Sequence, residues 1–331
     1  MSGRVIVVGD IHGCLAELHA LLEEIRFDPM DRLIAVGDLV GKGPDGAGVV
    51  RFFREEGHEA VLGNHDEKIL KWRAGRRGKP LRASHQAHAD AMSDANWDWL
   101  AALPLFLTLP EHGVLVVHAG ILPGVPIEKQ RRKDLLDMRS LRADGTPSSR
   151  VEDGEPWAGR YGGPVRVVFG HDAIRGLQRW PFALGLDTGC CYGGRLSALV
   201  LPDDRVVSQR AFAAHEPIEA PAKICQVSEL DSPRPVFVGH DAEGHPREVL
   251  VLATKDGEAR AYVNRCQHLP IPLDGGSREF LNGAGTHLMC GTHGALYRLD
   301  DGYCIEGPCE GTWLESVPLR IDEDGYVVLE I

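Results

Sequence analysis

Five short apolar runs between residues 5 and 169 each end in a cluster of glycine and polar residues. The runs cover residues 5–8, 33–36, 60–62, 114–117 and 165–169. Runs of this length with Gly-rich ends are typical of buried strands. Between the first two runs, leucines at 3.6-residue spacing predict an amphipathic helix over residues 15–25. Alternating strands and helices predict a layered α/β fold, which binds ligands beyond the carboxyl ends of its strands.

The sequence changes character near residue 213. Up to that point, further helices are predicted over residues 46–56, 67–74 and 84–103. Residues 213–222 contain proline and small residues without periodicity, which predicts a linker. Short strand candidates then follow at close intervals, over residues 249–253, 261–264, 286–289 and 326–330. We therefore expect an α/β domain over residues 1–212 and an all-β domain over residues 223–331.

The composition excludes some classes of function. The net charge of −12 repels polyanions, so no extended nucleic-acid face is expected. No apolar stretch is long enough to span a membrane, and the first run is too short for a signal peptide, which predicts a cytoplasmic protein without a membrane segment. Cytoplasmic thiols stay reduced, so the eight cysteines are expected to include metal ligands or reactive thiols rather than a disulfide framework.

The polar clusters after the apolar runs carry side chains that bind divalent metal ions. They read Gly9-Asp10-Ile11-His12-Gly13, Gly37-Asp38-Leu39-Val40-Gly41-Lys42-Gly43, Gly63-Asn64-His65-Asp66, His118-Ala119-Gly120 and Gly170-His171-Asp172. Carboxylate, imidazole and amide oxygen are ligands of hard to borderline metals, and neighbouring glycines permit close approach. One such cluster alone is usually a turn, but five after successive apolar runs predict a metal site.

This series of motifs resembles the phosphoprotein-phosphatase-type metallophosphatases, whose pattern is GDxHG, GDxVxRG, GNH(D/E), H(A/G)G and a later GH. The resemblance covers about residues 4–212 and implies two mixed sheets flanked by helices. It implies two divalent metal ions (manganese, iron or zinc) with these ligands: Asp10 and His12 on the first, Asp38 on both, and Asn64, His118 and His171 on the second. It also implies that His65 is the general acid in a direct in-line hydrolysis.

Two positions depart from that pattern. The family's Arg is Lys42 here, which neutralises a phosphate without bidentate geometry, so Arg139 is a second candidate for binding phosphate. In the protein phosphatases an Asp before that Arg orients the catalytic His, and this chain has Gly41 there. We then expect either that Asp66 helps to position the catalytic site or that a backbone carbonyl orients His65.

Other segments resemble the diadenosine-tetraphosphatase-like branch of this family. They are GDLVGKGPD, LGNHD and the run from Gly185 to Cys190, which reads GLDTGC. Members of the branch are associated with dinucleoside polyphosphates, capped RNA ends, polyphosphate or phosphoproteins. The resemblance therefore implies a phosphoester or phosphoanhydride hydrolase, and leaves open whether its substrate is a small molecule, an RNA end or a phosphoprotein.

A second set of ligands lies near the C terminus, in Cys266-x-His268 and Cys290-x-x-His293. Two thiolates and two imidazoles suit a tetrahedral zinc ion or a Rieske 2Fe-2S centre. Because zinc modules usually show Cys-x-x-Cys, this spacing favours the cluster. Residues 223–331 resemble a Rieske ferredoxin domain, which implies that both cysteines bind one iron and both histidines the solvent-facing iron.

The surroundings of this second set predict a low, ferredoxin-like potential within the Rieske range of roughly −150 to +300 mV. High-potential Rieske proteins have a serine two residues after the second histidine, and Ala295 stands there, whereas Tyr297 is retained. With fewer hydrogen bonds to its sulfurs, the reduced cluster is stabilised less, which lowers the potential.

Two functional hypotheses follow. The first is a metal-dependent hydrolase with an attached Rieske module that exchanges electrons with a redox partner. The alternative is an electron-transfer or redox-sensing protein that uses the phosphatase fold as a phosphate-binding scaffold. The complete ligand set favours the hydrolase, because a decayed site would have lost at least one ligand. A zinc-stapled interaction module at the C terminus would instead give a colourless protein.

Overall fold

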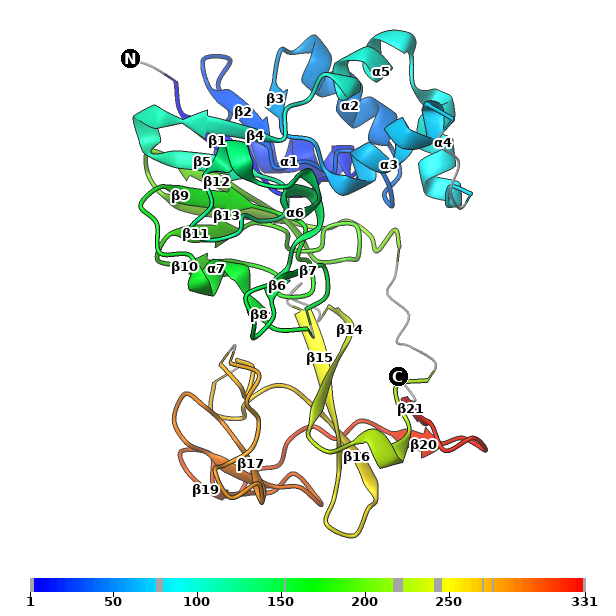
Figure 1. Ribbon diagram of the computed structural model, residues 1–331, viewed down its shortest axis with the longest axis vertical. Coiled ribbons are helices and arrows are strands. Elements are labelled where there is room, and N and C mark those ends of the chain that lie inside the picture. Colours follow the sequence, from blue (N-terminus) through cyan, green and yellow to red (C-terminus); the bar gives the residue numbers. More distant parts are fainter. Residues whose placement is uncertain are drawn as a thin grey trace. The chain divides into compact units, whose positions relative to one another are not determined.

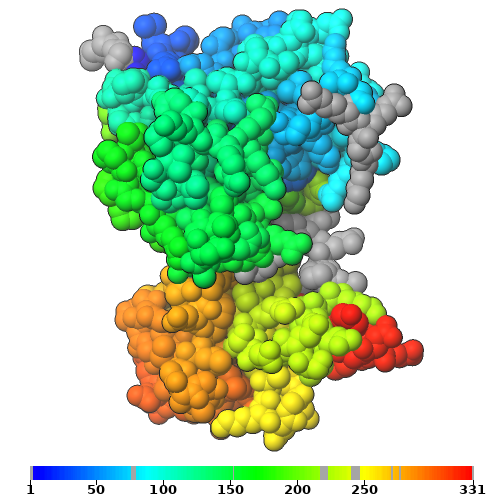
Figure 2. Space-filling view, viewed as in Figure 1, coloured from blue at the N-terminus to red at the C-terminus, as the bar shows by residue number. Residues whose placement is uncertain are grey.

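The computed structural model describes residues 3–75, 80–151, 153–216, 223–240, 246–269, 271–275 and 277–329. Described residues 3–216 belong to one compact unit, and residues 223–239 and 247–329 belong to another (Figure 1). Each unit is closely packed in the space-filling view, the first coloured from blue to green and the second from yellow-green to red (Figure 2). Of the predicted linker over 213–222, residues 217–222 lie outside the described residues.

Two mixed sheets form the centre of the first unit, with strand orders β13-β12-β1-β2-β3 and β10-β11-β9-β5-β4. Their strands are β1 (Val5–Val8), β2 (Arg32–Ala35), β3 (Glu59–Ala60), β4 (Phe106–Leu109), β5 (Val114–Val117), β9 (Arg166–Phe169), β10 (Gln178–Trp180), β11 (Ala183–Gly185), β12 (Arg195–Leu201) and β13 (Arg205–Arg210). Strand β1 is parallel to β2 and antiparallel to β12, and β5 is parallel to β9 and antiparallel to β4. The predicted pair of mixed sheets is confirmed.

Helices cover the outer faces of these sheets (Figure 1). They are α1 (Leu15–Ile25), α2 (Gly46–Glu55), α3 (Asn64–Arg73), α4 (Ala83–Ala91), α5 (Asp94–Ala101), α6 (Arg132–Asp137) and α7 (Trp157–Arg160). Because alternate strand residues face opposite sides, Val7 of β1 is buried with Val116 of the other sheet, while Ile6 is buried with Leu18 of α1. Trp157 belongs to a third buried cluster beyond the second sheet. The unit is therefore a four-layer sandwich of helices, two sheets and helices.

The helix predicted over residues 84–103 is in fact two helices, α4 and α5. The backbone is extended at Met92, and Ser93 begins α5 by accepting a hydrogen bond of 3.2 Å from the N–H of Asn96. Serine is a strong N-cap, because its side chain satisfies an otherwise unpaired N–H of the first turn. Three two-residue strands form a further small sheet: β6 (Ser140–Leu141), β7 (Pro147–Ser148) and β8 (Glu155–Pro156).

The second unit confirms the predicted all-β domain. Its strands are β14 (Arg234–His240), β15 (Pro246–Ala253), β16 (Ala259–Val263), β17 (His287–Met289), β18 (Leu296–Arg298), β19 (Cys304–Glu306), β20 (Leu319–Ile321) and β21 (Val327–Leu329). They form sheets β14-β15-β16, β17-β18-β19 and β20-β21. One buried cluster contains Cys266 and Cys290 together with Tyr297, so the core of this unit includes the two cysteines of the second set of predicted ligands.

All eight cysteines of the chain are buried as free thiols. In the parts of the chain that the structure describes, no helix has the length and apolar character needed to cross a bilayer.

Candidate metal sites

The candidate ligands of the first unit follow the ends of five strands. They are Asp10 and His12 after β1, Asp38 after β2, Asn64 after β3, His118 after β5 and His171 after β9. A glycine before His171 permits their close approach, since a Cβ added at Gly170 would lie only 1.9 Å from Oδ1 of Asp10. The N–H of His171 lies 3.1 Å from both carboxylate oxygens of Asp10. Residues far apart in sequence thus meet at one place.

Three histidines at this place are each anchored to a backbone carbonyl by one ring nitrogen. The pairs are His12 Nδ1 with Val40 (3.0 Å), His118 Nδ1 with Val36 (3.0 Å) and His171 Nε2 with Asp137 (3.1 Å). A ring nitrogen that faces a carbonyl carries the proton, so the other nitrogen of each neutral ring presents a lone pair. Metal-binding histidines are oriented in this way.

Asp38 lies between the donor atoms of these residues. Its Oδ2 is 3.4 Å from Nε2 of His12, and its Oδ1 is 3.6 Å from Nε2 of His118. That same His118 nitrogen is 3.0 Å from Oδ1 of Asn64. Donor atoms of Asp38, His118 and His171 all lie within 4.8 Å of one another. Lone pairs that converge in this manner repel one another unless a cation lies between them, so the donor set fits divalent metal ions.

The electrostatics of the site agree with that fit. Burial raises the pKa of Asp38 to about 7, and burial followed by repulsion from Asp187 and Asp38 raises the pKa of Asp10 well above its usual value. Burial lowers the pKa of His118 to about 4. Several buried carboxylates and neutral imidazoles therefore lie close together. Cations bound there would relieve the repulsion between the carboxylates.

The backbone is strained at several of these residues. The φ angles of His12, Asp38 and His171 are 50°, 50° and 66°, a left-handed conformation that is uncommon for residues other than glycine. Such strain costs on the order of 1–3 kcal/mol per residue and is typical of functional sites. The fold thus holds these side chains in directions that an unstrained loop would not give them.

Nδ1 of His65 faces a histidine side chain and not a backbone carbonyl, and Asp66 holds the backbone of the site. Asp66 accepts hydrogen bonds from the backbone N–H groups of Val40 (3.1 Å) and Gly63 (3.0 Å), so its carboxylate holds the loop. Nδ1 of His65 instead lies 2.8 Å from Nε2 of His85, a residue of α4 that the sequence analysis did not single out. The signal available in the sequence was the pair of histidines in the Ser-His-Gln-Ala-His segment, which lies within the helix predicted over residues 84–103.

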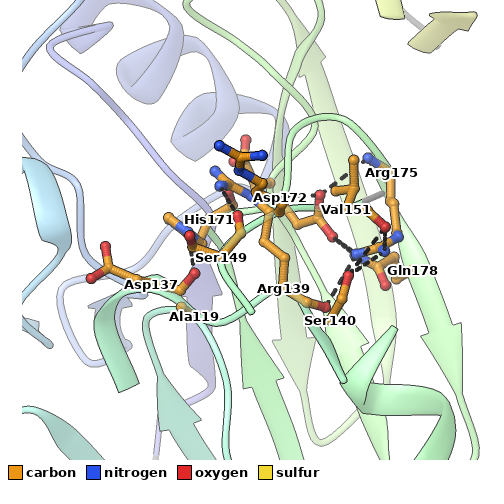
Figure 3. Close-up of polar contacts among 12 residues, drawn as sticks. Ala119, Asp137, Arg139, Ser140, Ser149, Val151, His171, Asp172, Arg175 and Gln178 are labelled. Carbon is orange, nitrogen blue, oxygen red and sulfur yellow. Dashed lines mark hydrogen bonds and ion pairs between the residues drawn. The ribbon is translucent and has the colours of Figure 1, made fainter. Parts of the chain in front are cut away.

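The two candidate phosphate-binding cations lie beside different candidate ligands, Lys42 beside His12 and Arg139 beside His171. Nζ of Lys42 is 3.1 Å from Nε2 of His12 and lies over the ring of Tyr192. Arg139 donates hydrogen bonds to the carbonyls of Ser149 (2.9 Å) and His171 (2.8 Å), so its guanidinium is held beside a candidate ligand (Figure 3).

Asp187 is a second residue whose role the sequence analysis missed. Its carboxylate is buried and accepts the N–H of Gly189 at 3.1 Å. Its charge raises the pKa of both Asp10 and Asp38, which places it within electrostatic reach of the candidate ligands. The segment GLDTGC was a family marker in the sequence, and that marker was the available signal.

The candidate ligands in the second unit are arranged in two pairs. Cys266 and Cys290 are 4% and 1% exposed, whereas His268 and His293 are exposed to solvent. The two histidine rings lie 4.9 Å apart. Buried sulfurs and exposed imidazoles fit a 2Fe-2S cluster with its histidine-bound iron toward solvent.

Tyr297 connects this site to two further cysteines. Its hydroxyl lies 3.4 Å from Sγ of Cys266 and 2.9 Å from Sγ of Cys309. Sγ of Cys304 is 3.4 Å from Sγ of Cys309. A hydroxyl next to a ligating sulfur can donate a hydrogen bond to it, so the retained tyrosine is in place to tune a cluster.

Comparison with known families finds a match for each of the two parts of the chain that hold the candidate sites. The calcineurin-like phosphoesterase family matches residues 3–218, and the Rieske [2Fe-2S] domain matches residues 220–318. The chain belongs to the calcineurin-like phosphoesterases and carries a C-terminal Rieske domain. It is a metallophosphatase, and the alternative of an electron-transfer protein on a phosphatase scaffold is not favoured.

Among its relatives, the symmetrical bis(5'-nucleosyl)-tetraphosphatase of Shewanella frigidimarina is 30% identical over 61% of this chain and 97% of the relative. The protein of the same name from Aromatoleum aromaticum is 32% identical, over 62% and 97%. A crystal structure of a candidate diadenosine tetraphosphatase has a TM-score of 0.59 and 44% identity, covering 64% of this chain and 95% of that one. These similarities support the predicted branch of the family.

Proposed function

We propose that the first unit hydrolyses the phosphoanhydride bonds of a dinucleoside polyphosphate with the aid of two divalent metal ions. The observation that carries this proposal is the position of Asp38 between the imidazoles of His12 and His118, each ring anchored by a backbone carbonyl. The names of the relatives support the substrate class, since both act symmetrically on bis(5'-nucleosyl) tetraphosphates.

The proposed ligands divide between the two ions. Asp10, His12 and Asp38 would hold the first, and Asp38, Asn64, His118 and His171 the second. When bound, two such ions supply Lewis acidity toward phosphoryl oxygens and a nucleophile at neutral pH, so no side chain needs to attack phosphorus. Manganese, iron and zinc all accept this mixture of oxygen and nitrogen ligands.

His65 is the proposed general acid. Its Nδ1 is occupied by His85, which leaves Nε2 to give a proton to the leaving phosphate oxygen. Lys42 and Arg139 are the proposed phosphate-binding groups, and a chain of phosphates offers each of them a separate oxygen. Asp66 acts through the loop whose backbone it holds.

In the second unit, Cys266 and Cys290 are proposed to hold one iron of the 2Fe-2S cluster, and His268 and His293 the other. The exposed histidines would face a redox partner, because electron transfer needs a short distance between the cluster and the partner's surface. The supporting observation is the contrast between the buried sulfurs and the exposed imidazoles.

The test is a product analysis with the full-length protein, purified without oxygen and assayed for metal content. Diadenosine tetraphosphate should yield ADP as its only nucleotide product, faster than capped RNA, polyphosphate or a phosphopeptide is hydrolysed. His65→Asn should lower kcat by about 10²–10⁴-fold with the metal content unchanged. Formation of ATP and AMP, or preference for another substrate, would overturn the proposed substrate class. An unchanged kcat in His65→Asn would overturn the role of His65.

A further inference from the structure

The contact between His65 and His85 is formed by a helix outside the five strand-end motifs. His85 is 0% exposed, and its Nε2 lies 2.8 Å from Nδ1 of His65. The two rings are nearly parallel, with an interplanar angle of 27° and centroids 5.0 Å apart. The second imidazole therefore fixes both the plane of the His65 ring and the direction of its outer nitrogen.

Gly41 makes room for this contact. A Cβ added at Gly41 would lie 2.9 Å from Nε2 of His85 and 3.0 Å from Nδ1 of His65. A side chain at this position would therefore occupy the space where the two imidazoles meet. Because Gly41 has no side chain, the imidazole of His85 can reach His65 through this space.

His88, three residues along the same helix, shows what a purely structural histidine looks like here. Its Nδ1 accepts the N–H of Gly41 at 3.0 Å, and its Nε2 lies 2.9 Å from the carbonyl of Gly43. Both of its nitrogens are paired. By contrast, Nδ1 of His85 is buried without a hydrogen-bond partner in the described structure. An unpaired buried polar atom costs about 1–3 kcal/mol, so stability alone does not explain His85.

We propose that His85 is a positioning residue for the general acid, and this inference rests on the proposed role of His65. Nε2 of His85 accepts the proton on Nδ1 of His65, which directs the N–H at Nε2 of His65 to the leaving oxygen. In this step His65 is an imidazolium with an N–H on each ring nitrogen. As a water-derived nucleophile bonds to phosphorus and the P–O bond breaks, the Nε2 proton moves to the leaving oxygen, which keeps the electron pair of the broken bond, and His65 is left as a neutral ring with its proton on Nδ1. Burial lowers the pKa of His85 to about 4, so its ring is neutral and can accept this hydrogen bond.

The experiment compares two aryl phosphates with the full-length, metal-loaded protein. Phenyl phosphate has a poor leaving group that needs protonation, whereas 4-nitrophenyl phosphate has a good one that needs it less. His85→Leu should lower kcat for phenyl phosphate about 10–100-fold more than kcat for 4-nitrophenyl phosphate, as expected when general acid catalysis is impaired. KM should change little for either substrate.

Two further variants separate positioning from packing. His85→Gln offers an amide oxygen in place of Nε2 and should recover most of the lost activity toward phenyl phosphate. His88→Leu disturbs the same helix and the same loop without touching His65, so it should lower both rates equally. The exchangeable proton between the two rings should give a low-field proton NMR signal that is absent in His85→Leu and in His65→Asn and present in His88→Leu.

The outcomes distinguish this inference from the proposed function. If His65→Asn shows the selective loss on phenyl phosphate and His85→Leu loses activity equally on both substrates, the positioning role is wrong while the role of His65 stands. If His65→Asn itself shows no selective loss, the general-acid assignment fails first. Thermal unfolding of each variant shows whether a uniform loss of activity comes from misfolding. If His85→Leu is misfolded, recovery of activity toward phenyl phosphate in His85→Gln supports the positioning role of His85, and a folded His85→Gln without recovery contradicts it.

Discussion

The two metal sites of this chain are built in opposite ways. The first takes its candidate ligands from the ends of five strands between Asp10 and His171, and nearly all of them are buried. The second takes its candidate ligands from two loops between Cys266 and His293, with the sulfurs buried and the imidazoles exposed. Hydrolysis needs several groups held rigidly around one phosphorus atom, whereas electron transfer needs one exposed edge. The chemistry thus accounts for the different construction.

The largest expected effect comes from Asp38, the proposed shared ligand of the first site. Asp38→Asn should lower phosphohydrolase kcat on the order of a thousandfold, since two metal ions contribute several kcal/mol to the transition state. Metal analysis should show a loss of divalent metal, while the visible absorption of the 2Fe-2S cluster stays unchanged. A variant that retained full activity would contradict the bridging role of Asp38.

The converse experiment removes the cluster. Cys290→Ser should abolish the Rieske-type EPR signal, because a buried sulfur ligand is lost. The metal content and the hydrolytic kcat of the first site should stay within about twofold of the unmodified protein if the two sites are built independently. A large loss of hydrolysis would show instead that the cluster supports the first site.

A smaller effect is expected from the packing around Asp10. Gly170→Ala places a methyl group 1.9 Å from the original position of Oδ1 of Asp10, so the carboxylate must move. The apparent metal affinity, measured by metal titration of activity, should fall about 10–100-fold, as for other changes that misdirect a ligand. Gly162→Ala is the matched control, because an added Cβ there has no neighbour within 4 Å. Equal affinities in the two variants would remove the close-approach explanation.

The smallest effect concerns the contact between the hydroxyl of Tyr297 and the sulfur of Cys266, a proposed cluster ligand. Tyr297→Phe removes a hydroxyl 3.4 Å from Sγ of Cys266. A hydrogen bond of about 1 kcal/mol corresponds to roughly 40 mV for one electron, so the midpoint potential should fall by about that amount. Tyr303→Phe is the control, because Tyr303 packs on Trp313. A potential that changed equally in both variants would contradict the role of Tyr297.

Much of the fold was predictable where hydrophobic pattern and length agree. Strands β1 and β5 and helix α1 have the predicted bounds, since each is a short buried run or an amphipathic helix with a clear end. The hairpin of β12 and β13 was not predicted. The seven residues of β12 are mostly buried on both faces of the strand, so they show no alternation of apolar and polar residues. The division between α4 and α5 was missed because Ser93 occurs within a continuous helical pattern.

The sequence by itself determined the types of donor side chain, their order and the two families, because short motifs such as Gly-Asp-x-His and Cys-x-x-His identify the ligand types. Only the tertiary structure decided which nitrogen of each histidine faces the site and which side chain meets His65. His85 reaches His65 from a different helix, through a space that Gly41 leaves open. Packing between separate segments determines such a contact, and no local pattern of residues specifies it.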